Sequence, residues 1–353
     1  MAPLVLRLSQ DLEVKVCVTG QHRQMLDQVL ELFQITPNYD LNLMKPNQNL
    51  ANLTGEVLNG VTQILQKEKF DWVLVQGDTT STIAGAMASF YQKVPVGHVE
   101  AGLRTFNLNS PFPEELNRQV TSKMARLHFA PTAESKKNLL KEGFSEKTIT
   151  ITGNTVIDAL KWVLKHSTPL DVALPFNLHG SQIILVTGHR RENFGEGFQQ
   201  ICEALRTIAL QQPDVQIVFP VHLNPNVRKP VNHILSSLPN LHLLEPLEYP
   251  RFVHLMNLST LILTDSGGVQ EEAPSLGKPV LVMRDTTERP EAVKAGTVKL
   301  VGANRQTIVD ETIHLLNDSK AYRKMAFAQN PYGDGTACEK ILETLLSFEK
   351  DNR

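Results

Sequence analysis

The chain has 353 residues, of which 41% are hydrophobic and 20% are charged, and its formal net charge is −2. This composition is typical of a globular protein and excludes a disordered or fibrous one. The sequence has no dense tract of lysine and arginine, so it does not indicate a basic surface that would bind nucleic acid or an anionic membrane. Any anionic ligand must be bound locally, and neither nucleic acid nor a membrane is expected as a partner.

The cysteines Cys17, Cys202 and Cys338 lie far apart, with no CxxC pair and no histidine cluster at metal-ligand spacing. Neither a disulfide framework nor a metal site is therefore predicted. No apolar run approaches the ~18 residues that cross a bilayer, and the N-terminus lacks the pattern of a signal peptide. We expect a cytoplasmic protein without a metal.

The first residues, Met1–Ser9, predict a helix, whereas a doubly wound domain normally opens on a strand. In the usual strand orders that first strand is central, and the turn after it binds phosphate. We therefore expect the first strand to be missing from this chain, at a cost to fold and function.

Short β-rich runs recur along the rest of the chain, and each is followed by a helix-like stretch. In the first half they are Val14–Val18, Trp72–Val75, Val96–Val99, Leu127–Ala130 and Thr148–Ile151. In the second half they are Ile183–Val186, Gln216–Phe219, Leu241–Leu244, Leu261–Leu263, Val280–Val282 and Val298–Val301. Strands that alternate with helices predict parallel sheets covered on both faces, and so an α/β protein of two similar domains.

The stretch Ser167–Gln182 contains two prolines and no clear period, so we place the linker there. The predicted domains are residues 1–167 and 168–335. A last helix, residues 336–353, follows a turn-rich segment and carries apolar residues on one face.

Three acidic residues follow predicted strands or begin a predicted helix: Asp78, Glu100 and Glu114. Each has an ordinary structural explanation. Asp78 or Thr79 could cap a helix, Glu100 could pair with Arg104, and Glu114 could be a common helix-start acid. Taken together, they put carboxylates around one crevice, where crowding and burial could separate their pKa values into acid and base roles.

The segment Thr187–Asn193 has the sequence TGHRREN and lies between a strand and a helix. Its amides and cationic side chains, His189 among them, could hold a phosphate group. The alternative is a solvated basic turn. Its position at a strand end favours the functional interpretation.

The segment Thr264–Ala273 joins a strand to a helix through Ser266, Gly267 and Gly268. Exposed amides, a hydroxyl and the positive end of a helix suit a pyrophosphate, and Glu272 further along could accept the hydroxyls of a ribose. The alternative is a glycine turn of steric purpose. A loop upstream brings Phe252, which could contact a base or belong to the core.

The sequence contains neither GxxxxGK[ST] nor GxGxxG. ATP hydrolysis and ordinary dinucleotide binding therefore lack their usual signatures, and a nicotinamide enzyme is disfavoured.

Six segments then identify a family by their order along the chain: GQHRQMLDQVL, QGDTTST, HVEAGLRT, PEELNR, TGHRREN and TDSGGVQEEAPSLGKPVLVMRDTTERPE. The chain resembles the non-hydrolysing UDP-N-acetylglucosamine 2-epimerases from Met1 to the last helix. The resemblance implies the glycosyltransferase-B fold, in which two Rossmann-like domains face each other across a cleft and the terminal helix returns to the first. It also implies a homodimer without a cofactor.

The reaction that the resemblance implies interconverts UDP-GlcNAc and UDP-ManNAc. UDP is eliminated in the anti sense to give 2-acetamidoglucal and is then re-added, with a proton returned to the opposite face of C2. The product would supply envelope or capsule polysaccharide synthesis. Removal and return of the C2 proton need carboxylic groups, and the departing UDP needs cationic stabilisation.

Carried over by motif, the resemblance makes Asp78, Glu100 and Glu114 the catalytic carboxylates, with their individual roles left open. It makes His189 a further catalytic residue and places it at the diphosphate, with Ser266, Gly267 and Gly268 around it. Glu272 would hold the ribose, and Phe252 would lie by the uracil.

Some family members bind a second UDP-GlcNAc as an activator, and Gln21, Gln24, Arg190 and His222 resemble the residues of that site. The family's arginine in the nearby loop is replaced by Asn47, which argues against activation here. The family's first strand and its Gly-Thr-Arg-Pro-Glu turn are expected before Met1, so we expect a chain that is less active and less stable than a full member.

Three alternatives stay open. The protein could be a 2-epimerase of another UDP-amino sugar, or a transferase of the glycosyltransferase-B fold, which would need an acceptor pocket. It could also be an inactive protein that binds nucleotide sugars, although binding alone would not need all three carboxylates.

Overall fold

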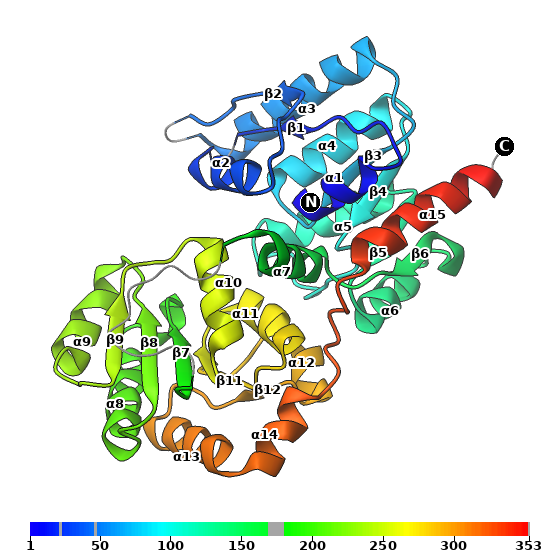
Figure 1. Ribbon diagram of the computed structural model, residues 1–353. Coiled ribbons are helices and arrows are strands. Elements are labelled where there is room, and N and C mark those ends of the chain that lie inside the picture. The colour runs from blue at the N-terminus through cyan, green and yellow to red at the C-terminus, as the bar shows by residue number, and fades with distance from the viewer. Residues whose placement is uncertain (21–22, 46–47, 169–179, 352–353) are drawn as a thin grey trace. The chain divides into compact units, whose positions relative to one another are not determined.

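The computed structural model describes residues 1–20, 23–45, 48–168 and 180–351 (Figure 1). The chain forms two compact units, which are Met1–Ala159 with Tyr332–Arg353, and Leu160–Pro331. Most of the predicted linker, residues 169–179, lies outside the described residues. Among the described helices, none is both long and apolar enough to cross a membrane.

The first unit contains a four-stranded sheet in the order β3-β4-β5-β6, with all neighbours parallel. These strands are Val73–Gln76, Val96–Val99, Leu127–Ala130 and Ile149–Ile151. A separate parallel pair is formed by β1 (Cys17–Val18) and β2 (Tyr39–Asp40). Strand β2 was not predicted, because two residues are too short for a periodic pattern.

Eight α-helices and one 3-10 helix surround these strands among the described residues of the first unit. They are α1 (Ala2–Leu8), α2 (Arg23–Leu32), α3 (Leu50–Lys67), α4 (Thr80–Tyr91), α5 (Glu114–Met124), α6 (Ala133–Lys141), α7 (Thr155–His166), which runs on into the second unit, and α15 (Ala337–Asp351), with the 3-10 turn η1 (Glu146–Thr148) completing the set. The predicted helices at both ends of the chain are confirmed.

The two terminal helices share one core. Leu4 of α1 is fully buried beside Phe129 of β5 and Ile341 of α15. The backbone N–H groups of Ala337 and Cys338 donate to the carboxylate of Asp158 at 3.3 and 2.9 Å, which satisfies the free donors at the start of α15. The last residues are therefore an integral part of the first unit.

The second unit contains a six-stranded parallel sheet in the order β12-β11-β10-β7-β8-β9. In chain order its strands are β7 (Ile183–Thr187), β8 (Gln216–Pro220), β9 (Leu241–Leu244), β10 (Leu261–Thr264), β11 (Val280–Val282) and β12 (Val298–Leu300). All six were predicted, with ends that differ by at most one residue. A parallel sheet with its strands buried on both faces explains their continuous apolar runs.

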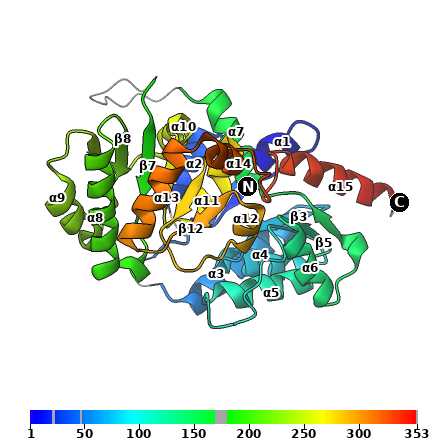
Figure 2. The ribbon, with the colours of Figure 1, turned by 90° about the horizontal axis from the view of Figure 1, so that it is seen from below.

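The helices of the second unit fill the spaces between these strands in sequence. They are η2 (Arg191–Asn193), α8 (Glu196–Gln211), α9 (Pro225–Leu235), α10 (Tyr249–Leu258), α11 (Gly267–Glu272), η3 (Ala273–Leu276), α12 (Pro290–Ala295), α13 (Arg305–Asn317) and α14 (Ser319–Ala326). Helices α8 and α13 pack against each other over a large apolar core (Figures 1 and 2).

Strand order decides which loops are neighbours at the carboxyl edge of each sheet. In the first unit β3 lies beside β4, so the turn at Gly77 and Asp78 is adjacent to Glu100. In the second unit β7 lies beside β10, so the TGHRREN segment is adjacent to Asp265 and Ser266. These two edges carry the predicted functional residues.

Candidate active site

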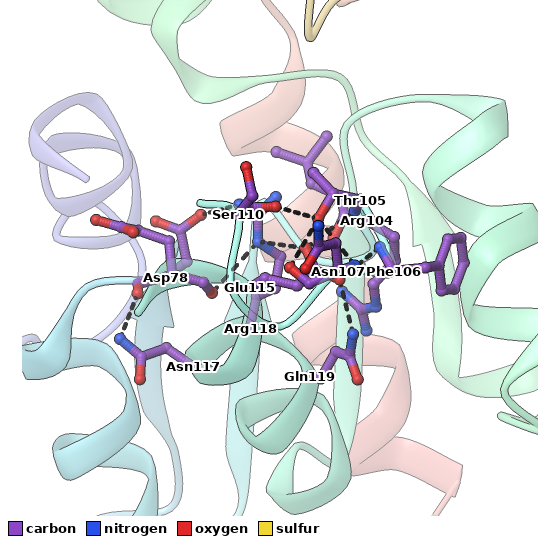
Figure 3. A network of polar contacts seen from close by, with 12 residues as sticks. Asp78, Arg104, Thr105, Phe106, Asn107, Ser110, Glu115, Asn117, Arg118 and Gln119 are labelled. Carbon is purple, nitrogen blue, oxygen red and sulfur yellow. Dashed lines mark hydrogen bonds and ion pairs between the residues drawn. The ribbon is translucent and has the colours of Figure 1, made fainter. Parts of the chain in front are cut away.

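Asp78 is held by two residues of α5 and does not cap a helix. Thr79 is the N-cap of α4, where its side chain accepts a hydrogen bond from Thr82 N at 3.3 Å. The Asp78 carboxylate pairs with Arg118 at 3.1 Å, and Asn117 Nδ2 donates to the Asp78 carbonyl oxygen at 2.8 Å (Figure 3). The capping explanation therefore belongs to Thr79, and Asp78 is left with a charged partner.

Glu100 occupies a strained backbone conformation directly after β4. Its φ angle is +63°, in the left-handed region that non-glycine residues rarely adopt. Its carboxylate accepts a hydrogen bond from Gln76 Nε2 at 3.2 Å. Backbone strain of this kind persists mainly where a side chain is needed for function.

The structural alternative for Glu100, an ion pair with Arg104, is wrong. The fully buried guanidinium of Arg104 instead bonds to Glu142, with Nε 2.6 Å from the carboxylate. Glu142 lies just after α6, 38 residues further along the chain, so the local sequence held no sign of this pairing.

The two adjacent glutamates in the first turn of α5, Glu114 and Glu115, lie in different environments. Glu115 is completely buried and accepts from the backbone N–H groups of Thr105 and Phe106, at 2.9 and 3.0 Å, and from Gln119 (Figure 3). Burial alone would raise the pKa of Glu115, but these hydrogen bonds hold it below its usual range. Glu115 therefore shapes the loop, while the half-buried Glu114 is the candidate for chemistry.

His98 supports the Asp78 turn from beneath. The imidazole is fully buried, Nε2 donates to the carbonyl oxygen of Gly77 at 2.8 Å, and Nδ1 has no hydrogen-bond partner among the described residues. Burial lowers the pKa of His98 to about 3. The side chain is therefore neutral at physiological pH.

The first unit is expected to lose stability as the pH falls below the ordinary histidine pKa. Between about pH 6.5 and the folded-state pKa of about 3, His98 binds a proton in the unfolded chain but not in the native protein, so acid favours unfolding. From pH 6.5 to 4.5 the folding constant should fall about 50-fold more in the wild type than in His98→Gln, which can still donate to Gly77. Urea unfolding followed by Trp72 fluorescence in a Trp162→Phe background measures the free energy of unfolding at each pH. An equal dependence of this free energy on pH in the wild type and in His98→Gln would contradict the prediction.

In the second unit, the TGHRREN segment is organised by the buried Asp265. The carboxylate accepts from the backbone N–H groups of His189 and Arg190, both at 2.9 Å from Oδ2. The His189 ring is 41% exposed and stacks on His222, with centroids 5.8 Å apart. Burial lowers the pKa of His189, against the opposing effect of Asp265. The turn is therefore an ordered structure and not merely a solvated basic loop.

Arg190 brings positive charge to the glycine turn that follows β10. A Cβ atom on Gly267 would lie 3.5 Å from the Arg190 guanidinium, so the two are in van der Waals reach. The Arg190 Nε is buried and has no hydrogen-bond partner among the described residues. Ser266 is the N-cap residue of α11, yet its side chain makes no capping hydrogen bond. A cationic donor and the N-terminal end of α11 therefore meet at this turn, which suits an anion.

Glu272 ends α11 as a buried carboxyl group. Tyr249 Oη donates a hydrogen bond to it, and burial raises the pKa of Glu272 to about 7. A Cβ atom on Gly268 would come within 4.0 Å of Glu272 Oε2, so that glycine keeps the space beside the carboxylate open. Phe252 is half-buried on α10, not in a loop as predicted, so it is neither loop nor full core.

The four residues compared with an activator site fall in different places. Gln21 and the divergent Asn47 lie outside the described residues. Gln24 is exposed on α2 of the first unit, whereas Arg190 and His222 both lie next to His189 in the second.

Sequence reasoning missed four contributors: Arg118, Asn117, Glu115 and Asp265. Each acts on a partner that lies elsewhere in the chain or on backbone groups, so no local pattern distinguished it. Arg118 alone had a signal, because it ends the PEELNR segment one helical turn after Glu114.

Two parallel α/β units, one with carboxylates at its sheet edge and one with a turn suited to an anion, define an enzyme of the glycosyltransferase-B fold class. The comparisons agree. The family model described as UDP-N-acetylglucosamine 2-epimerase matches residues 5–346. The UDP-N-acetylglucosamine 2-epimerase of Escherichia coli K12 is 59% identical, over 100% of this chain and 95% of that protein.

Solved structures show the same likeness. The Neisseria meningitidis UDP-GlcNAc 2-epimerase bound to UDP-GlcNAc is 54% identical with a TM-score of 0.87, over 98% of this chain and 96% of that one. The Methanocaldococcus jannaschii UDP-GlcNAc 2-epimerase in complex with UDP-GlcNAc and UDP is 34% identical with a TM-score of 0.75, over 98% and 95%. The chain belongs to the UDP-N-acetylglucosamine 2-epimerase family. The predicted fold class, family and class of enzyme are confirmed.

Proposed function

We propose that this protein interconverts UDP-GlcNAc and UDP-ManNAc, acting on them without a cofactor. The observation that carries the proposal is Glu100, a carboxylate kept at a strained backbone position beside the Asp78 turn. A protein that only bound nucleotide sugars would gain nothing from such strain.

The reaction proposed is an elimination followed by an addition. A carboxylate takes the proton from C2 as the C1–oxygen bond breaks, and UDP leaves with the electron pair of that bond. The sugar becomes 2-acetamidoglucal, with a double bond between C1 and C2. Return of a proton to the other face of C2, with UDP adding again at C1, gives the epimer. Carboxylic groups on both sides of C2 are therefore required.

Asp78, Glu100 and Glu114 are the groups proposed for these proton transfers. Arg118 holds the carboxylate of Asp78, and Gln76 holds that of Glu100, so each is fixed in place before the sugar binds. Pre-organisation of this kind lowers the cost of reaching the transition state. Which carboxylate acts on which face is left open.

The second unit is proposed to bind UDP. His189, Ser266, Gly267 and Gly268 would hold the diphosphate, and the nearby Arg190 would add positive charge as the leaving group departs. Glu272 would accept the ribose hydroxyls, and Phe252 would lie by the uracil. Arg190 and His222 are the described residues of the second unit that a bound activator would use, together with Gln24 of the first.

The biological setting is proposed from the same resemblance. The protein would work as a homodimer in the cytoplasm, with residues 1–167 and 168–335 as its two domains, and would supply ManNAc units for envelope or capsule polysaccharide.

The proposal is tested by incubating the purified chain with UDP-GlcNAc in deuterium oxide and following C2 by NMR. The expected result is deuterium at C2 together with UDP-ManNAc. Release of UDP and free sugar, or transfer of the sugar without exchange at C2, would overturn it. UDP-glucose serves as a control substrate that lacks the 2-acetamido group.

A further inference from the structure

Asp265 is a fully buried carboxylate whose partners all come from one turn of the chain. Its two oxygens accept from His189 N at 3.1 and 2.9 Å, from Arg190 N at 2.9 Å, and from Asn193 Nδ2 at 3.4 Å. Burial of an ionised carboxylate is costly unless hydrogen bonds compensate for it. These donors compensate for it, and in doing so they tie the TGHRREN segment to the end of β10.

The approach of the turn to Asp265 depends on Gly188. A Cβ atom at that position would lie 3.1 Å from the buried ring of Phe198 and 3.8 Å from Asp265 Oδ2. A side chain there would be crowded by the Phe198 ring, so either that ring or the turn would have to shift. Two features 77 positions apart, the glycine of one loop and the aspartate of another, therefore serve the same contact.

Asp265 also contacts the imidazole of His189, the residue after Gly188. His189 Nδ1 lies 3.3 Å from Asp265 Oδ1. A carboxylate at this distance favours a proton on Nδ1, so Nε2, on the other side of the ring, is the nitrogen left for a ligand. The stacked ring of His222 lies 24° from parallel with that of His189 and restricts its rotation.

We propose that Asp265 is a positioning residue, which holds the TGHRREN turn and orients His189 so that Nε2 is presented to the diphosphate. The inference rests on the proposed function only for the identity of the ligand. A carboxylate with a purely structural role would be satisfied by the backbone donors, and would not need to face the imidazole nitrogen as well.

The first test is spectroscopic. Nitrogen-15 shifts of the His189 ring in the full-length protein should show the neutral form protonated on Nδ1. The Asp265→Asn variant should lose that preference, and the measured pKa of His189 should fall, because Arg190 and His222 remain nearby while the negative charge is gone. A wild-type ring protonated on Nε2 would overturn the proposal.

The second test is a double-mutant cycle on UDP binding, measured by calorimetry. Asp265→Asn should weaken binding about tenfold in the wild-type background and by at least about threefold less in a His189→Asn background. Equal effects in the two backgrounds would mean that Asp265 acts on the fold alone. Asp214→Asn, the same change at an exposed position before β8, is the matched control and should leave the affinity unchanged.

The outcomes separate this inference from the proposed function. If His189→Asn binds UDP as well as the wild type does, the role of His189 at the diphosphate is wrong, whatever its tautomer. If His189→Asn weakens binding but the ring is not protonated on Nδ1, the site stands and the positioning role of Asp265 fails.

Discussion

Glu100→Gln is expected to lower the rate of C2 exchange and epimerisation by about 10³-fold, with UDP affinity unchanged. The amide keeps the length of the side chain and can still bond to Gln76, but it cannot take or return a proton. The measurement is the initial rate of UDP-ManNAc formation, beside the dissociation constant for UDP. Glu13→Gln, at a side chain that is 84% exposed, is the matched control and should keep full activity.

A second variant at the same position separates catalysis from folding. Glu100→Gly should be equally inactive, yet its unfolding free energy should stay within about 1 kcal/mol of the wild type, because glycine adopts a φ angle of +63° without strain. Loss of both activity and several kcal/mol of stability would show that Glu100 is a structural residue. Measurable epimerisation in either variant at the wild-type rate would remove Glu100 from the proposed mechanism.

Gly102→Ala is expected to destabilise the first unit by at least about 3 kcal/mol. The φ angle of Gly102 is +90°, and a Cβ atom would lie 2.3 Å from the carbonyl oxygen of Ser135 in α6. Backbone atoms cannot rotate away as the end of a side chain can. The clash must therefore move α6 away from the loop after β4, and Asn138 Nδ2 would lose its hydrogen bond to the Gly102 carbonyl oxygen.

The measurement for Gly102→Ala is urea unfolding followed by the fluorescence of Trp72 in a Trp162→Phe background. Gly55→Ala provides the control, since a Cβ atom there meets nothing within 4 Å and the residue lies inside α3. That variant should be stabilised, by up to about 1 kcal/mol. A Gly102→Ala protein as stable as the wild type would mean that α6 can shift at little cost.

Most of the fold could be predicted because parallel, buried strands leave a clear mark in the sequence. Val96–Val99, Leu127–Ala130, Leu241–Leu244 and Val280–Val282 were predicted with the bounds that the structure has. The run Val14–Val18 was only partly right, since just Cys17 and Val18 form a strand. Hydrophobic runs indicate where a strand lies, but hydrogen bonding to a neighbouring strand decides where it starts and stops.

The candidate site was less predictable, for reasons that differ from residue to residue. The positions of Asp78 and Glu100 follow from the rule that ligands bind at the carboxyl ends of parallel strands. The rule could not show that Thr79 rather than Asp78 caps α4, nor that Arg104 turns to Glu142. The hydrogen bonds between His189 and Asp265 join loops 76 residues apart, and only the pairing of β10 with β7 brings these loops together.

The return of α15 to the first unit has a consequence for how the protein is synthesised. Leu160–Pro331 is one continuous segment, so the second unit can fold as soon as it has left the ribosome. The first unit needs Ile341 and the contact of Asp158 with Ala337, and these residues are translated only after the second unit. The half of the protein that is made first is therefore completed last, and chaperones that shield exposed apolar surface would act on it for the longer time.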